Sequence, residues 1–393
     1  HKTNHNAMNK PGSNFKHWIV IFNILILSGI CNASSSVHRY TVSSSPWEEK
    51  FGNHRAVLTV DKPAEAVALD LTWRRHDRSP ETKRMLIVDA QTGDTIKNIY
   101  RQEVNNEKCR LVFGPVANPG KYYFYYLSYE VQTGWGFYGK GYCKPEPLPD
   151  AAWINQNQVE SRAKRNTLPL AKVVDIQSRS AFDSFFPMEI IPLAAEKKAF
   201  LSKHPADFLL FPEDRKFPIR MKDEIPLKWV QGGPSSFFEG EAAPNEYYAF
   251  QVGLFASKKD IENVKISFSE LKGTGFSLSP EAFTCFNAGG TGPYGDKFEK
   301  QINVQKGAVQ ALWMGINLPG NIPAGNYRAT VIVSADQVQP QKVEVRLKVT
   351  GPMLADRGDN EPWRHSRLRW LNSTLGIDRS EEHTSELQSH HDL

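Results

Sequence analysis

Pairs of neighbouring carboxylates are the first residues in this chain whose spacing could do chemistry. Cleavage of a glycosidic bond needs two carboxyl groups that face one substrate cleft at a defined separation. Neighbouring side chains on a strand point to opposite faces of a sheet, so adjacent carboxylates on a strand do not meet that requirement. We therefore interpret these residues as surface charge and assign no catalytic residue. The pairs are Glu213 with Asp214, Asp223 with Glu224, and Glu239 with Glu241.

A second pattern is the GxGxxG spacing at residues 134–139, Gly-Trp-Gly-Phe-Tyr-Gly. A dinucleotide-binding loop of this kind joins a strand to a helix so that free backbone amides meet the pyrophosphate, and residues 140–149 cannot open a helix. The segment instead predicts a glycine-rich β-hairpin. Trp135 and Tyr138 could stack on the apolar face of a sugar ring, which makes them candidate carbohydrate-binding residues. Packing of both rings in a core is the simpler alternative.

No metal or cofactor site is predicted. Beyond residue 33 the cysteines are Cys109, Cys143 and Cys285, an odd number without the spacing of zinc ligands or of a disulfide framework. Cys109 and Cys143 could pair because both lie in the first folded region, and isolated buried thiols are the open alternative. The acidic residues within 356–361 lack the ligand spacing of a calcium-binding EF-hand, and helix capping explains them.

Composition bounds the class of protein and its partners. The 393 residues are 40% hydrophobic and 23% charged, which is ordinary for a globular protein and predicts two or three domains. The net charge of +5 comes from scattered lysines and arginines and not from a basic stripe. We therefore expect no nucleic-acid partner.

Both ends of the chain differ in residue composition from the rest. An apolar run at 18–30 follows Met8 and two lysines and ends near Ala33, which is typical of a signal peptide cleaved after Ala33. The run is shorter than the ~20 residues that span a bilayer, so we expect no membrane span and an exported protein, periplasmic, on the cell surface or secreted. Residues 379–393 resemble a translated sequencing adapter and are left out of the fold prediction.

The period of the apolar residues predicts an all-β fold with two tandem immunoglobulin-like β-sandwiches. In the first region every second residue from Val67 to Trp73 is apolar, which is typical of a half-buried strand. In the second region the same alternation occurs at 248–254, and the segments 327–333 and 343–349 predict a closing hairpin. Residues 363–375 have near-helical spacing and predict a short C-terminal helical segment.

Changes in residue composition along the chain predict the domain boundaries. Residues 145–180 are rich in Pro, Asn, Gln, Arg and Lys with few periodic apolar residues, which predicts a polar connector between the two sandwiches. The predicted organisation is an N-terminal extension and signal peptide at 1–33, a first β-sandwich at 34–147, a connector at 148–180, a second β-sandwich at 181–353, the start of a truncated following region at 354–378, and adapter sequence at 379–393.

Four motifs of the second region occur in a fixed order. They are Glu-Tyr-Tyr-Ala-Phe-Gln-Val at 246–252, Cys-Phe-Asn-Ala-Gly-Gly at 285–290, Leu-Trp-Met-Gly-Ile at 312–316 and Pro-Ala-Gly-Asn-Tyr at 323–327. In this order they resemble the N-terminal domain of family 123 glycoside hydrolases and related Bacteroidetes glycoside hydrolase-like proteins, over roughly residues 185–349.

The resemblance implies an exo-acting β-N-acetylgalactosaminidase or a close relative, which retains configuration and uses the acetamido group of its substrate as the nucleophile. It also implies an adjacent Asp and Glu on a downstream (β/α)8 barrel, and no position of this chain matches that pair. Asp223 and Glu224 have the right residue types but precede the second sandwich, so the role is not carried over to them.

These features predict the noncatalytic N-terminal portion of an exported glycoside hydrolase, whose glycan substrate would bind to a catalytic domain missing from this chain. The fragment by itself is expected to be inactive. The alternative hypothesis is a noncatalytic glycan-binding or surface scaffold protein built from the same sandwiches, with Trp135 and Tyr138 as sugar contacts.

Overall fold

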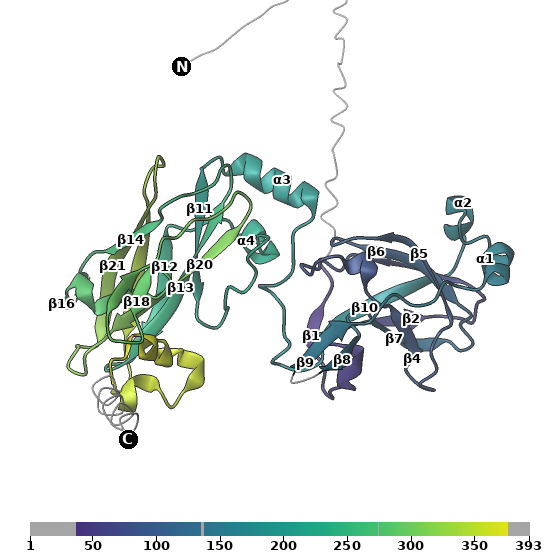
Figure 1. The fold of residues 1–393 in the computed structure, drawn as a ribbon, viewed down its shortest axis with the longest axis horizontal. Helices are drawn as coiled ribbons and strands as arrows, with labels where there is room; N and C mark the ends of the chain where they lie inside the picture. Colours follow the sequence, from purple (N-terminus) through teal and green to yellow (C-terminus); the bar gives the residue numbers. More distant parts are fainter. Residues whose placement is uncertain (1–36, 135–136, 274, 376–393) are drawn as a thin grey trace, which may run out of the picture. The chain divides into compact units, whose positions relative to one another are not determined.

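A computed structural model describes residues 37–134, 137–273 and 275–375 (Figure 1). The predicted signal peptide and the adapter-like residues lie outside this range. The described residues form two β-sandwiches with few helices, as the sequence predicted. Within these ranges no helix is long and apolar enough to cross a membrane.

The first sandwich consists of two layers that share one strand, β10. Residues 172–178 of β10 lie between β2 and β1 in one layer, whereas residues 170–171 pair with β3 in the other. The layers have the orders β4-β7-β2-β10 and β10-β3-β6-β5. The strands are β1 (Tyr40–Val42), β2 (His54–Val60), β3 (Val67–Leu71), β4 (Leu86–Asp89), β5 (Asn98–Val104), β6 (Cys109–Gly114), β7 (Gly120–Tyr125) and β10 (Leu170–Ser178).

The core of the first sandwich follows the alternation read from the sequence. Leu69, Leu71 and Trp73 are buried between the layers, whereas Asp70 points to the opposite, exposed face of β3. Strands β2 and β7 of the other layer contribute Leu58 and Phe124 to the same core. Burial of side chains of this size contributes about 1.5–3 kcal/mol each, so this face of β3 is a main source of stability.

Residues 148–180 were predicted to be a connector, and in the structure they belong to the first sandwich. They form α1 (Ala151–Asn157), α2 (Arg162–Arg165) and β10. The indole of Trp153 in α1 is buried and its Nε1 donates to the carbonyl of Glu65 at 2.8 Å. The sequence did not reveal β10 because its pairing with β2 shifts register between Val173 and Asp175, which breaks the period-two pattern.

The second sandwich packs a four-stranded sheet, β11-β13-β20-β17, against a sheet of order β12-β22-β21-β15-β16 in which β14 also pairs with β21. The predicted closing hairpin is confirmed as β21 and β22. The strands are β11 (Phe208–Asp214), β12 (Phe237–Ala242), β13 (Tyr247–Ala256), β14 (Lys265–Phe268), β15 (Leu271–Gly273), β16 (Phe276–Leu278), β17 (Phe283–Cys285), β20 (Val309–Asn317), β21 (Gly325–Ser334) and β22 (Gln341–Val349), with a separate hairpin of β18 (Gly289–Thr291) and β19 (Lys297–Glu299).

Strand β13 is buried on both faces. Tyr248, Phe250, Val252 and Leu254 point into the core between the two sheets, as their spacing predicted. Phe255 on the opposite face packs with Trp229 of α4 (Leu227–Gly232) and Phe200 of α3 (Ala194–Lys203). The two helices therefore cover an apolar sheet face that would otherwise be exposed.

One turn device occurs in both sandwiches. The hydroxyl of Tyr122 donates to the carbonyl of Asn118 at 2.7 Å, and the hydroxyl of Tyr327 donates to the carbonyl of Pro323 at 2.8 Å. Both rings are buried, as expected for a tyrosine that re-enters a sheet after a Pro- and Gly-containing turn. This resembles the tyrosine corner of immunoglobulin-like domains.

The C-terminal segment is helical, as predicted, but it consists of short 3-10 turns in place of one α-helix. The turns cover Ala355–Gly358, Pro362–Arg364 and Ser366–Asn372. Asp356, Arg357 and His365 have positive φ angles, which interrupt any regular helix. The segment is held to the second sandwich by a buried carboxylate, Glu246, which bonds to Arg215 and Arg364.

Candidate functional site

The glycine-rich segment forms the predicted hairpin, with β8 (Tyr129–Gly134) antiparallel to β9 (Phe137–Tyr142). Trp135 lies outside the described residues. Tyr138 lies in β9, opposite Thr133, and its side chain is not described. Sugar contact by these two residues therefore stays a prediction. The base of the hairpin is described in full, and Tyr129 faces Tyr142 across it.

A cavity of about 180 Å³ lies at this base, and we call it the hairpin cavity. Three parts of the chain that are far apart in sequence meet there: the start of β2, the residues that follow β3, and the hairpin itself. The segment at 185–189 contributes further lining. The lining residues are Asn53, His54, Trp73, Arg74, Arg75, His76, Asp77, Tyr126, Leu127, Tyr129, Tyr142, Phe185 and Glu189.

Arg75 is the central polar group of the hairpin cavity and is only 6% exposed. Its guanidinium lies 4.3 Å from the ring of Trp73 and 4.7 Å from the ring of Tyr126, which is the geometry of a cation-π contact. Nε and Nη2 donate to the two oxygens of Asp77 at 2.7 and 2.6 Å. Among the described residues, Nη1 has no hydrogen-bond partner.

The electrostatics of the hairpin cavity favour binding over proton transfer. Burial raises the pKa of Asp77, but hydrogen bonds from Arg75 and Lys83 outweigh it and hold the pKa below its usual value. Burial also raises the pKa of Glu189, but contact with His76 and other charged neighbours outweighs burial and lowers the pKa below its usual value. A general acid in glycoside cleavage needs a raised pKa. Both carboxylates are therefore unsuited to that role.

His54 is neutral at physiological pH. Burial lowers its pKa to about 4, although the backbone carbonyl of Asp183 accepts a hydrogen bond from the ring at 3.2 Å. The ring packs against Phe185 with 3.8 Å between the ring centroids. His54 thus adds a neutral aromatic wall to the cavity, and its charge state couples the cavity to pH.

The carboxylate pairs of the sequence have structural partners or lie apart. Asp223 pairs with Arg78 at 3.0 Å on the surface. Glu224 pairs with Lys197 at 2.6 Å. Glu213 is buried and accepts from the indole of Trp229 at 2.7 Å, whereas Asp214 caps a turn through the amide of Lys216. Glu239 and Glu241 are exposed on β12.

The three described cysteines are free thiols, so Cys109 and Cys143 are not paired in this structure. Burial raises the pKa of Cys109, and it raises the pKa of Cys285 to about 11. Neither thiol is an activated nucleophile. In the described part of the chain no group of three or more His, Cys, Asp or Glu residues is placed to hold a metal ion.

The sequence pointed to the hairpin but not to the cavity beneath it. The run Trp73-Arg74-Arg75-His76-Asp77 carries a signal, because a cluster of charged residues directly after a buried strand is unusual. Its partners at 54, 126 and 189 could not be found by spacing. These residues come together only in the folded sandwich, where β2 and β7 pair in one layer and β3 lies in the other.

The fold and this site define a class of protein: tandem immunoglobulin-like sandwiches with an aromatic-lined cavity whose two carboxyl groups have lowered pKa values. Residues 45–179 match the family model described as glycoside hydrolase 123, N-terminal domain. The recognition of family 123 is therefore confirmed, and this part of the chain is a noncatalytic domain related to glycoside hydrolases. The match lies in the first sandwich, whereas the sequence motifs lay in the second. Assignment of 181–353 to this domain stays a prediction.

Solved structures show more distant similarity. A family 123 glycoside hydrolase from Clostridium perfringens has 14% identity and a TM-score of 0.30, over 38% of this chain and 28% of that one. The periplasmic chaperone SfaE has 9% identity and a TM-score of 0.21, over 30% of this chain and 58% of that one. The sporulation control protein Spo0M from Bacillus subtilis has 10% identity and a TM-score of 0.21, over 37% of this chain and 50% of that one.

These similarities are too low to carry a functional argument. The chain spans little more than a quarter, 28%, of the length of the Clostridium perfringens enzyme. No curated protein matches this chain.

Proposed function

We propose that this chain is the noncatalytic β-sandwich portion of an exported glycoside hydrolase that acts on glycans, with a specificity similar to that of β-N-acetylgalactosaminidases. The match of residues 45–179 to a glycoside hydrolase 123 N-terminal domain carries the proposal. The carboxylates of the hairpin cavity support the noncatalytic part of it, because Asp77 pairs with Arg75 and Glu189 pairs with Arg220. Catalysis would come from a separate barrel domain of the same protein.

The first prediction concerns hydrolysis by the chain alone. The purified chain should release no 4-nitrophenol from 4-nitrophenyl N-acetyl-β-galactosaminide above the rate of a matched double variant, Asp223→Asn with Glu224→Gln. These residues are the only adjacent Asp-Glu pair in that order, and both already bind basic side chains. Turnover that disappears in the double variant would contradict the noncatalytic assignment.

The gene itself tests the other half of the proposal. Sequencing past the codon for Asp378 should reveal a coding region for a (β/α)8 barrel with an adjacent Asp and Glu. A frame that continues into an unrelated fold would remove the glycoside hydrolase assignment, whatever the chain binds.

A glycan-binding role is the second candidate function, and the hairpin cavity favours it. Aromatic rings and a buried guanidinium surround a space of about 180 Å³. Trp73 and Tyr126 line the cavity but are only 1% and 2% exposed, so the accessible ring face is that of Tyr142, which is 55% exposed. Within the described residues, Arg75 has one donor nitrogen without a partner. Carbohydrate sites combine such ring faces with a few placed polar groups. The sequence candidates Trp135 and Tyr138 belong to the same glycine-rich segment.

Tyr142→Ala tests this role, and we expect it to weaken glycan binding about tenfold, as loss of a single stacking ring implies. Tyr142 lines the cavity and is 55% exposed, so the fold should tolerate the change. Tyr294→Ala is the matched control, because Tyr294 is 87% exposed and lies outside the cavity. Binding would be screened on a glycan array and quantified by calorimetry, with Trp135→Ala as a further variant. Equal binding by all three variants and the parent would exclude the hairpin as the glycan-binding site.

A further inference from the structure

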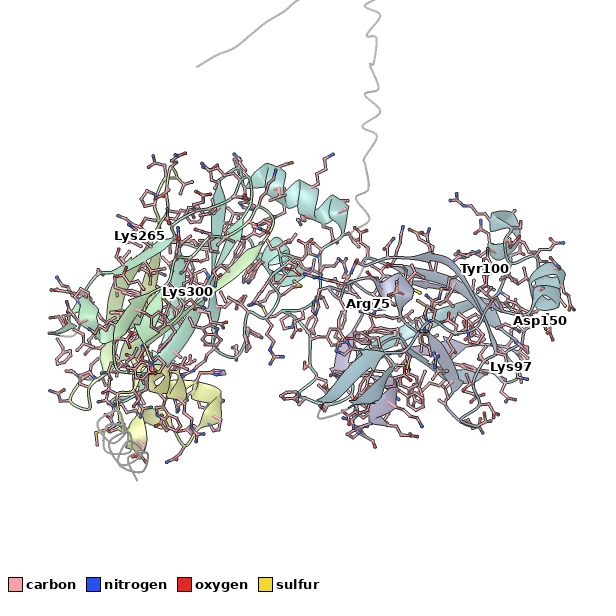
Figure 2. The ribbon with its side chains drawn as sticks, in the orientation of Figure 1. Arg75, Lys97, Tyr100, Asp150, Lys265 and Lys300 are labelled. Atoms are coloured by element: carbon pink, nitrogen blue, oxygen red, sulfur yellow. The ribbon has the colours of Figure 1, made fainter. Side chains whose placement is uncertain are left out.

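A second concave surface lies on the outer face of the first sandwich, away from the hairpin. It is a groove of about 510 Å³ between the sheet strands β3, β5 and β6 and the segment that contains α2, and we call it the α2 groove. Its size is within the roughly 300–1,000 Å³ range of ligand sites. Tyr100, one of its lining residues, lies at the same end of the sandwich as Asp150 (Figure 2).

The floor of the α2 groove is a row of charges fixed by strand register. Arg110 on β6 lies directly opposite Asp70 on β3 and opposite Glu103 on β5. Its Nε donates to Asp70 Oδ1 at 2.9 Å, and its Nη1 donates to Glu103 Oε2 at 3.2 Å. Because the sheet sets the positions of all three, the floor is ordered before any ligand arrives.

The wall of the groove is held to the floor at two points. The amide of Gln102 donates to the carbonyl of Val159 at 3.1 Å, and Arg165 Nη2 donates to the carbonyl of Leu69 at 3.2 Å. The α1 side of the wall is fixed by the buried ring of Trp153, which packs with Val112 and Tyr100. The groove is thus part of the folded domain and is not a gap beside a loose segment.

Several polar groups of the wall have no partner. Within the described residues, the side chains of Glu160, Arg162 and Asn166 are exposed and make no hydrogen bond, so they are solvated and can exchange water for the polar groups of a ligand. Arg165 Nε differs from them, because it is buried without an acceptor. Buried donors are nearly always satisfied in folded proteins, so this nitrogen is an unusual feature of the wall.

The charges of the groove indicate the class of ligand. Three carboxylates, Asp70, Glu103 and Glu160, balance three guanidinium groups, Arg110, Arg162 and Arg165, so the lining has no net charge. A balanced groove gives no electrostatic attraction to anions such as nucleic acid or polyuronate. Vicinal hydroxyl groups donate and accept at once, and they fit alternating carboxylates and guanidiniums. The ring of Tyr100 adds an apolar surface for a pyranose face.

We propose that the α2 groove binds a neutral oligosaccharide. The proposal rests on the glycan-directed function inferred above, and it names a surface separate from the hairpin cavity. The floor would hold the hydroxyl groups of the oligosaccharide, while Arg162 and Asn166 would contact it from the wall.

The test uses the full chain, with chitotriose and cellotriose as neutral probes and trigalacturonate as the anionic probe. Calorimetry gives the Kd, and nitrogen-15 NMR of the Gln102 and Asn166 side-chain amides reports the location. The double variant Asp70→Asn with Arg110→Met removes one ion pair of the floor. Asp61→Asn with Lys172→Met is the matched control, because it removes a surface pair of similar length, 2.8 Å, outside the groove.

We expect a neutral trisaccharide to shift both amide signals, the floor variant to weaken its Kd at least tenfold, and the control variant to leave the Kd unchanged. The proposal is overturned if neither neutral probe shifts these signals, if the floor variant binds like the parent, or if trigalacturonate binds more tightly than both neutral probes. Loss of binding in Tyr142→Ala with normal binding in the floor variant would keep a glycan-binding function but remove it from the groove.

Discussion

Replacing Glu246 by glutamine is expected to lower the free energy of unfolding by about 3–5 kcal/mol. Glu246 is fully buried and accepts from Arg215 at 2.6 Å, from Arg364 at 3.1 Å and from the amide of Ala243 at 2.8 Å. Glutamine keeps the shape but removes the negative charge. Within the described residues, the buried Arg215 guanidinium then has no ion-pair partner, which is the costly outcome for a broken internal ion pair, whereas Arg364 keeps its ion pair with Glu361 at 3.1 Å.

Urea denaturation of the parent and the variant measures this loss. Glu239→Gln is the matched control, because Glu239 is 64% exposed and pairs with Arg346 at 3.1 Å on the surface. Exposed pairs contribute about 0.2–1 kcal/mol. If Glu246→Gln and Glu239→Gln cost the same, the buried cluster is not a stabilising element.

The same variant should loosen the C-terminal segment. Arg364 belongs to that segment, and Arg215 also donates to its carbonyl at 3.2 Å, so Glu246 joins residues 355–372 to the second sandwich. Without the carboxylate, trypsin should cut after Arg364, Arg367 or Arg369 faster than in the parent. Unchanged cleavage would show that other contacts, such as Asp359 with Arg369, suffice.

The second large effect is a loss of stability at mildly acidic pH through His54. Burial lowers the pKa of this histidine from 6.5 to about 4 in the folded chain. Between these two values the unfolded chain binds a proton that the folded chain does not, so stability falls as the pH decreases. The contribution is fully present above pH 6.5, and about 3 kcal/mol is lost by pH 4.

Urea denaturation at pH 7.5, 5.5 and 4.5 measures how the free energy of unfolding depends on pH. His54→Gln removes the titrating group, so its free energy of unfolding should depend less on pH in this window. The pKa values of His38 and His365 are also lowered by burial and give a slope of the same sign, so the difference between parent and variant isolates His54. Parallel curves for parent and variant would show that His54 is not the sensor. Asp77 and Glu189 lose their contribution at lower pH, because their folded pKa values lie below the usual carboxyl range.

Several elements of the fold could be read from residue types alone. The alternation of Leu69, Leu71 and Trp73 predicted a strand with one buried face, and the glycines at 134–139 predicted a hairpin. These signals are local, because side chains two apart on a strand share a face whatever the strand pairs with. Strand β10 was missed for the opposite reason: a register shift and polar residues hide its alternation, and its place between β2 and β3 is decided by pairing partners more than a hundred residues away.

By itself, the amino-acid sequence determined the all-β class, the two sandwich regions and the resemblance to family 123 glycoside hydrolases. Only the tertiary structure decided which polar side chains are buried and which charged side chains face each other. Arg75 and His54 are ordinary surface residue types until β2, β3 and β7 bury them together, and Arg110 faces two carboxylates only because of strand register. Burial and register join residues distant in the chain, and spacing along a sequence carries no information about either.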